Sequence, residues 1–214
     1  MTDTIIIDYG MGNLRSVQKA FERIGEAARI SSDVSEIAQA ERLVLPGVGA
    51  FRDAIAAIRR GDLANVIRDH VLEDRPFLGI CLGLQMLFDV SFEDGQHEGL
   101  GVIPGVVQRF QLPPEFKIPH MGWNQLDVTH QPNHGLLQNL GSAPWFYFVH
   151  SYHVVPSDRS WIASETDYSG PFVSAVARGN VMATQFHPEK SQSNGMTLLR
   201  NFLACTASTV ASHS

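Results

Sequence analysis

The sequence predicts an α/β fold in which a central, mainly parallel β-sheet is covered by helices on both faces and is extended by antiparallel strands. Two patterns support this prediction. In the first half of the chain, short apolar runs alternate with segments of helical periodicity, as in strands joined by crossover helices. In the second half, β-branched and aromatic runs dominate and are separated by turns that contain glycine or proline.

Three apolar runs in the first half mark the expected parallel strands. Each is followed by a segment whose hydrophobic side chains recur at helical spacing. The expected strands cover residues 5–7, 43–45 and 77–80, and the expected helices cover residues 14–24, 51–58, 63–71 and a segment that opens after Cys81.

The second half predicts the antiparallel extension. Residues 146–154 form one long candidate strand. Residues 172–177 and 181–186 flank Arg178-Gly179-Asn180, which predicts a hairpin, and a final helix is expected over residues 196–203.

Length and composition indicate one domain. A chain of 214 residues with 44% hydrophobic and 18% charged residues has the size and composition of an ordinary globular protein. Neither an internal repeat nor a linker divides it. We therefore expect a single domain over residues 1–205 and a frayed tail over residues 206–214, which are small and mostly polar.

Charge and apolar patterning argue against two classes of partner. Sixteen Lys and Arg against 22 Asp and Glu give a net charge of −6, which disfavours binding to nucleic-acid phosphates. The longest nearly uncharged stretch, Pro76 to Phe88, is shorter than the roughly 20 residues that cross a bilayer, and the first residues do not resemble a signal peptide. We expect a cytoplasmic protein whose two cysteines, Cys81 and Cys205, are thiols.

The segment Gly79-Ile80-Cys81-Leu82-Gly83 follows an apolar strand and opens a helix, which is the pattern of a nucleophile elbow with sulfur in place of oxygen. On so sharp a turn, flanking residues need to lack a Cβ atom. Backbone N–H groups at the helix start favour thiolate over thiol. Taken alone, the pattern also fits a small buried cysteine between two packing glycines.

His187 and Glu189 form the second candidate for chemistry. In extended backbone, residues i and i+2 project to the same side, so the carboxylate of Glu189 could hold one imidazole nitrogen while the other addresses a thiol. An isolated His-Pro-Glu also fits a solvated surface turn. Together with the elbow it predicts a Cys81, His187 and Glu189 triad. A metal site is not expected, since Pro132 separates His130 from His134 and no Cys-x-x-Cys is present.

An acyl-transfer site also needs donors for the developing oxyanion. The N–H of Leu82, next to the predicted nucleophile, is one candidate. The loop Pro46-Gly47-Val48-Gly49, which follows a predicted strand, could supply the second donor at Val48 or Gly49, although such a loop can also merely turn the chain.

Three segments, in this order and spacing, resemble the class I, triad-type glutamine amidotransferases. They are Pro-Gly-Val-Gly at 46–49, Gly-Ile-Cys-Leu-Gly-Leu-Gln at 79–85 and Gln-Phe-His-Pro-Glu at 185–189. The resemblance spans nearly the whole chain and implies the three-layer, flavodoxin-like fold of that family. It also implies hydrolysis of L-glutamine to glutamate and ammonia through a thioester on Cys81, without a cofactor.

The same resemblance implies the substrate contacts. Gln85 and Glu93 would contact the α-amino and α-carboxylate end of glutamine, and backbone near Gly49, Ser151 and Tyr152 would complete the pocket. A spacing of four residues places Gln85 on the same helix face as Cys81, although an exposed helix position is the alternative.

A Gly10-x-Gly12 pair after the first predicted strand is similar to a dinucleotide fingerprint. Arg15 stands where the third glycine belongs, and no acidic residue clearly ends a second strand in register, so we expect no nicotinamide cofactor.

Within the family, further segments are similar to the subunits that serve a cyclase making imidazole glycerol phosphate in histidine biosynthesis. These segments cover residues 8–13, 119–124, 148–152 and 190–191. The resemblance implies a heterodimer with a cyclase of (β/α)₈-barrel type, and 214 residues leave no room for a second domain of about 250 residues. Asn13, Trp123 and Lys190 are the candidates for the docking face.

Three alternatives remain open at this point. The chain could be the glutaminase subunit of another synthase, of the pyridoxal phosphate, anthranilate or aminodeoxychorismate type. It could be a γ-glutamyl hydrolase that acts without a partner. It could also be a noncatalytic binding module, although a complete triad argues against that.

Overall fold

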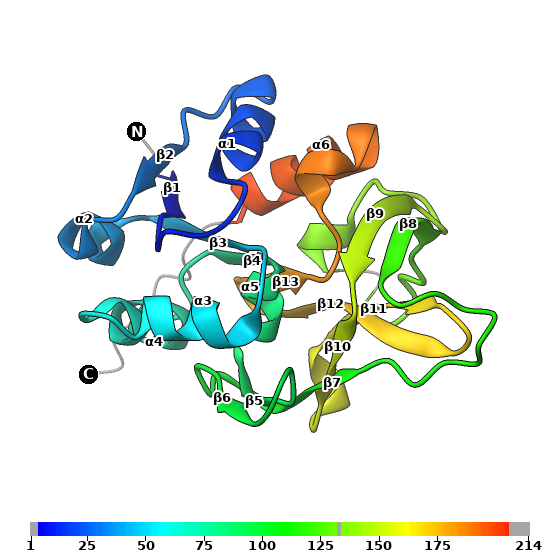
Figure 1. The fold of residues 1–214 in the computed structure, drawn as a ribbon. Helices are drawn as coiled ribbons and strands as arrows, with labels where there is room; N and C mark the ends of the chain where they lie inside the picture. Colours follow the sequence, from blue (N-terminus) through cyan, green and yellow to red (C-terminus); the bar gives the residue numbers. More distant parts are fainter. Residues whose placement is uncertain (1–3, 132–133, 206–214) are drawn as a thin grey trace, which may run out of the picture.

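The computed structural model describes residues 4–131 and 134–205, and Figure 1 shows its arrangement. The segment predicted to be a frayed tail lies outside the described residues. The chain forms the predicted three layers, with helices on both faces of one large sheet.

The large sheet contains eleven strands within the described residues, and its order along the main path is β2-β1-β3-β4-β13-β12-β10-β7-β5-β6, with β11 paired to β12. The strands β2, β1, β3, β4 and β13 are mutually parallel. This confirms the parallel arrangement predicted for β1, β3 and β4, whereas β2 was not predicted and β13 comes from the second half of the chain, which was predicted to be antiparallel. Their bounds are Thr4–Ile7 for β1, Arg29–Ser31 for β2, Arg42–Gly47 for β3, Phe77–Cys81 for β4 and Val181–Thr184 for β13.

The rest of the sheet is mainly antiparallel, as predicted. The expected hairpin is confirmed, since β12 pairs antiparallel with β13. One pair departs from the expectation, because β5 and β7 run parallel. These strands cover Phe88–Ser91 for β5, His97–Glu98 for β6, Ile103–Arg109 for β7, Tyr152–Pro156 for β10, Ile162–Asp167 for β11 and Pro171–Arg178 for β12.

The long strand predicted over residues 146–154 is wrong in one respect. The chain forms two strands there, β9 over Trp145–His150 and β10 over Tyr152–Pro156, with Ser151 between them. β10 stays in the large sheet, whereas β9 pairs with β8 (His120–Gln125) in a separate two-stranded ribbon. At Ser151 the chain therefore passes from the two-stranded ribbon, where β9 pairs with β8, into the large sheet, where β10 pairs with β7 and β12.

Side chains that alternate along the central strands divide the core into two clusters. Ile5 and Ile7 face one cluster and Ile6 faces the other, and all three are fully buried. The first cluster is covered by α2 (Val34–Gln39), α3 (Phe51–Ile58) and α4 (Leu63–Leu72), and the second by α1 (Leu14–Arg23) and α6 (Gln192–Leu203). Buried apolar faces on both sides of the sheet explain why its central strands are continuous apolar runs.

The remaining short elements lie in the connections. They are α5 (Leu82–Gln85) and the 3₁₀ turns Gly135–Leu137, Arg159–Trp161 and Pro188–Lys190. Within the part of the chain that the structure describes, no helix is both long enough and apolar enough to cross a membrane.

Candidate active site

Cys81 ends β4 and begins α5 in a strained backbone conformation. Its φ of 55° and ψ of −106° fall outside the regions that non-glycine residues prefer. A Cβ atom on Gly83 would lie 1.9 Å from the carbonyl oxygen of Leu45, and one on Gly79 would lie 2.9 Å from the Cβ atom of Ala183. The predicted elbow is therefore present, and both glycines are required by steric crowding.

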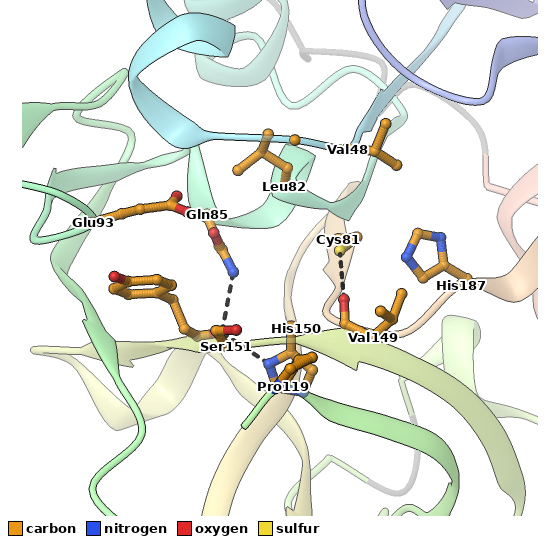
Figure 2. A pocket seen from close by; sticks show the side chains of 12 residues that line it. Val48, Cys81, Leu82, Gln85, Glu93, Pro119, Val149, His150, Ser151 and His187 are labelled. Atoms are coloured by element: carbon orange, nitrogen blue, oxygen red, sulfur yellow. Dashed lines mark hydrogen bonds between the residues drawn. The ribbon is translucent and has the colours of Figure 1, made fainter. Parts of the chain in front are cut away.

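His187 and Glu189 meet as the two-residue spacing predicts. His187 Nδ1 lies 2.8 Å from Glu189 Oε1, and both side chains are almost fully buried. The other ring nitrogen, Nε2, is buried and has no hydrogen-bond partner among the described residues. Figure 2 shows the imidazole beside Cys81, so the unpaired nitrogen is available to the thiol.

The surroundings of His187 determine its charge. Burial by itself lowers the pKa of the imidazole, but interactions with the neighbouring Cys81 sulfur and the Glu189 carboxylate raise this pKa above its ordinary value. A histidine held between a cysteine sulfur and a carboxylate is an arrangement suited to activate a cysteine nucleophile.

A cavity of about 330 Å³ opens in front of Cys81 and His187. The oxyanion and substrate-binding residues predicted from the sequence all line it, whereas Glu189 lies behind His187. The lining consists of Val48, Gly49, Cys81, Leu82, Gln85, Glu93, Pro119, Val149, His150, Ser151, Tyr152 and His187 (Figure 2).

Gln85 is buried, so the alternative of an exposed helix position is wrong. Its Nε2 donates to the carbonyl oxygen of Tyr152 at 3.1 Å and to Oε1 of Gln185 at 3.2 Å. Because both amide hydrogens have acceptors, the orientation of the Gln85 amide is determined, and its oxygen is the group left to face other partners.

Glu93 connects the acidic loop to the loop after β3. Its Oε2 accepts a hydrogen bond of 2.9 Å from the backbone N–H of Phe51, at the start of α3. Burial raises the pKa of the half-buried Glu93 carboxyl. The carboxylate therefore borders the cavity and also satisfies a helix N-terminus.

The loop that contains Val48 and Gly49 is tethered at its start. The Tyr9 hydroxyl donates to the carbonyl oxygen of Pro46 at 3.0 Å. Burial, and after it the charge of Cys81, raise the pKa of Tyr9, which therefore remains a donor. Gly49 has a φ of 95°, which explains a glycine at that position, and Val48 is 40% exposed.

Five further residues at the site were not predicted from the sequence: Tyr9, Pro119, Val149, His150 and Gln185. Gln185 is fully buried, and its Nε2 lies 3.7 Å from the sulfur of Cys81. The alternation that pairs His187 with Glu189 could have indicated it, since Gln185 stands two residues before His187. His150 is the last residue of β9, directly before the bend at Ser151, and it lines the cavity there.

The three residues predicted to dock a partner lie at two separate locations, one around Tyr147 and one beside Val48. The Trp123 ring, on β8, lies 6.2 Å from the ring of Tyr147, and Lys190 Nζ lies 5.7 Å from the same ring. Asn13 is exposed and instead lines a small hollow beside Val48, His187 and Glu189. In the described ranges, no cluster of three or more His, Cys, Asp or Glu side chains is placed to hold a metal ion.

Comparison with known proteins decides the family. The profile of the family described as glutamine amidotransferase class-I matches residues 5–205. The chain belongs to the class I glutamine amidotransferases.

Among relatives of this class I glutamine amidotransferase, the imidazole glycerol phosphate synthase subunit HisH of Rhodopirellula baltica is 60% identical, over 92% of this chain and 95% of that protein. The protein of the same name from Syntrophotalea carbinolica is 55% identical, over 92% of this chain and 98% of that protein. In a structure of PurLQS from Thermotoga maritima, one chain matches the fold with a TM-score of 0.72 at 20% identity, covering 95% and 98% of the two chains.

We predict that Gly83→Ala destabilises this class I glutamine amidotransferase by about 2 kcal/mol or more, because the new methyl group would overlap the carbonyl of Leu45. Gly135→Ala is the control, since a Cβ atom there meets nothing within 4 Å. Urea unfolding of both variants measures the effect. Equal stabilities would contradict the steric account of the elbow.

Proposed function

We propose that this chain hydrolyses L-glutamine through a thioester on Cys81 and passes the ammonia to a cyclase partner that makes imidazole glycerol phosphate in histidine biosynthesis. The observation that carries the chemistry is the meeting of Cys81 and His187 at one cavity, with Glu189 bound to the far nitrogen of the imidazole. The synthase is chosen because full-length relatives at 45–60% identity bear the name imidazole glycerol phosphate synthase subunit HisH.

The first step is attack of the Cys81 thiolate on the side-chain carboxamide carbon of glutamine. The carbonyl oxygen becomes an oxyanion, which the N–H of Leu82 and an N–H from Val48 or Gly49 would stabilise. All of these residues border the cavity that holds the nucleophile.

His187 moves the protons. The imidazolium gives its Nε2 proton to the leaving nitrogen, the C–N bond breaks, and ammonia departs, leaving a glutamyl thioester. Neutral His187 then takes a proton from water, which attacks the thioester carbon and releases glutamate and the thiolate. The Glu189 carboxylate holds Nδ1 and so keeps Nε2 directed at the sulfur throughout.

The α-substituents of glutamine are recognised at the other end of the cavity. The Gln85 amide oxygen and the Glu93 carboxylate are acceptors suited to the α-ammonium group. Backbone groups of Gly49, Ser151 and Tyr152 would receive the α-carboxylate.

The partner is a separate chain, for which we propose a (β/α)₈-barrel cyclase in a cytoplasmic heterodimer. Protonation makes free ammonia unreactive, so the acceptor needs to lie beside the cavity. The β8–β9 ribbon borders the cavity through Val149 on β9, and Pro119, directly before β8, also lines it. The ribbon exposes Met121, Trp123 and Trp145. Exposed aromatic and methionine side chains at one face favour a protein interface.

We predict that Cys81→Ala, reconstituted with the cyclase, loses glutamine-dependent synthesis and retains synthesis from added ammonium salt. The sulfur is needed only to release ammonia, so the cyclase reaction itself should be untouched. Cys205→Ser is the matched control and should keep both activities. Loss of both activities in Cys81→Ala would point to failed folding or docking, and retention of both would refute thioester chemistry at Cys81.

Glu189→Gln should reduce kcat/KM for glutamine about 100-fold or more, because the imidazole loses the group that orients it. The alkaline limb of the pH profile, where His187 loses its proton, should move to lower pH. Burial continues to lower the pKa of His187, while one of the groups that raise it is removed. Glu115→Gln on the surface is the control. An unshifted alkaline limb would contradict the assignment.

Trp123→Ala should weaken binding of the cyclase about 30-fold, since truncation of a central interface aromatic typically costs about 2 kcal/mol. Isothermal titration calorimetry against the cyclase measures the dissociation constant. Leu72→Ala removes a side chain that is 73% exposed on α4 and should leave binding unchanged. Equal affinities of the two variants would remove the ribbon from the docking face.

A further inference from the structure

A continuous series of hydrogen bonds, most of them buried or partly buried, leads away from Cys81. Gln185 Nε2 lies within hydrogen-bonding distance of the Cys81 sulfur at 3.7 Å, and Gln185 Oε1 accepts from Gln85 at 3.2 Å. Gln85 also donates to the carbonyl oxygen of Tyr152. Gln185 is therefore the bridge between the nucleophile and the amide proposed to bind the substrate.

The series continues through two histidines to β8. His150 Nδ1 lies 2.8 Å from the same Tyr152 oxygen, and His150 Nε2 lies 3.0 Å from His120 Nδ1. His120 Nε2 lies 3.3 Å from Asn124 Nδ2, which also donates to the carbonyl oxygen of Asp167 at 2.9 Å. Eight groups are thus connected, and they lie on β4, α5, the residue that follows β13, β10, β9, β8 and β11.

Donors and acceptors in this series can be arranged in only one way. The Tyr152 carbonyl only accepts, so His150 carries its proton on Nδ1 and accepts at Nε2. His120 must then donate from Nδ1 and accept at Nε2 from Asn124. The amide of Asn124 is fixed as well, because its Oδ1 accepts from the backbone N–H of Gln125.

Both histidines are held neutral and in place by their surroundings. Burial is the largest cause that lowers the pKa of His150 to about 3 and of His120 to about 4. Aromatic rings enclose them, with Tyr168 centred 4.1 Å from His120 and Phe172 centred 5.1 Å from His150. Neither ring can reorient without disturbing this packing.

We propose that Gln185, His150 and His120 are positioning residues, which hold the Cys81 sulfur and the Gln85 amide in their reactive orientations and connect them to β8. This inference rests on the proposed function, and it concerns residues that act through Cys81, Gln85 and Tyr152. Gln185 fixes the position of the Cys81 sulfur through its hydrogen bond. The two histidines fix the position of the Tyr152 carbonyl, and this carbonyl in turn orients the amide of Gln85. Because β8 also carries the exposed Met121 and Trp123, the series joins the pocket to the strand proposed to dock the cyclase.

The sulfur end is tested by the alkylation rate of Cys81 with iodoacetamide in a Cys205→Ser background, a measurement that needs no glutamine. Gln185→Met keeps the length of the side chain but loses its donor, and it should slow alkylation about threefold to tenfold. Ser174→Ala is the matched control. Ser174 lies on β12, and its backbone carbonyl accepts from the N–H of Gln185. The substitution removes only the buried side-chain hydrogen bond between Ser174 and Ser164, so this variant should alkylate like the parent.

The histidine end is tested in the complex with the cyclase. His120→Phe keeps an aromatic ring but loses the donor to His150, and it should raise the KM for glutamine about fivefold to tenfold with little change in kcat. His120→Asn supplies an N–H close to the position of Nδ1 and should restore KM to within about twofold of the parent.

The outcomes separate this inference from the proposed function. An inactive parent enzyme would refute the function, while the alkylation assay would still report on Gln185. An active parent with unchanged alkylation in Gln185→Met, or with equal KM values in His120→Phe and His120→Asn, would overturn the inference. If Gln185→Met does not fold, the two His120 variants decide alone.

Discussion

The site depends on a steric constraint at the end of β4, where no side chain fits at the positions two residues before and two residues after Cys81. Gly83 lies against the Leu45 carbonyl on β3, and Gly79 lies against Ala183 on β13. The two strands that confine the elbow are therefore the two that deliver its partners, since β3 leads to the loop with Val48 and β13 leads to His187. The strain of a positive φ at Cys81 costs about 1–3 kcal/mol, and pairing of β4 on both edges offsets it.

Strand order explains how distant segments reach one cavity. In open α/β sheets, ligand sites form at the carboxyl ends of adjacent parallel strands. β13 is the second strand of a hairpin with β12, so its connection along the chain is antiparallel. Because the hairpin reverses the direction of the chain after β12, β13 nevertheless runs parallel to its other neighbour, β4. The antiparallel half of the fold therefore supplies the His187 and Glu189 end of the site to a nucleophile made by the parallel half.

Local rules predicted the parts of this site that are set by local geometry. Glycines around Cys81 and the two-residue period at His187 and Glu189 are visible in the sequence because crowding and extended backbone act over a few residues. The bend at Ser151 was not predictable in this way. Residues 146–154 contain no Gly or Pro, and only the change of pairing partner from β8 to β7 ends the first strand. For the same reason His150 was missed as a lining residue, since its place depends on that bend.

The polar side chains around the cavity differ in whether their hydrogen-bonding atoms have partners. This difference marks the atom that is available to react. Gln85 and His150 have hydrogen-bond partners that fix their orientation. Among the cavity-lining side chains in the described part of the chain, His187 Nε2 is the one buried nitrogen or oxygen without a partner. Leaving such a group unpaired costs about 1–3 kcal/mol, a cost that falls when a neighbouring thiol or a substrate atom supplies the missing contact. The hydrogen-bonded side chains around the pocket thus leave one unmet hydrogen bond, located beside the sulfur that is proposed to react.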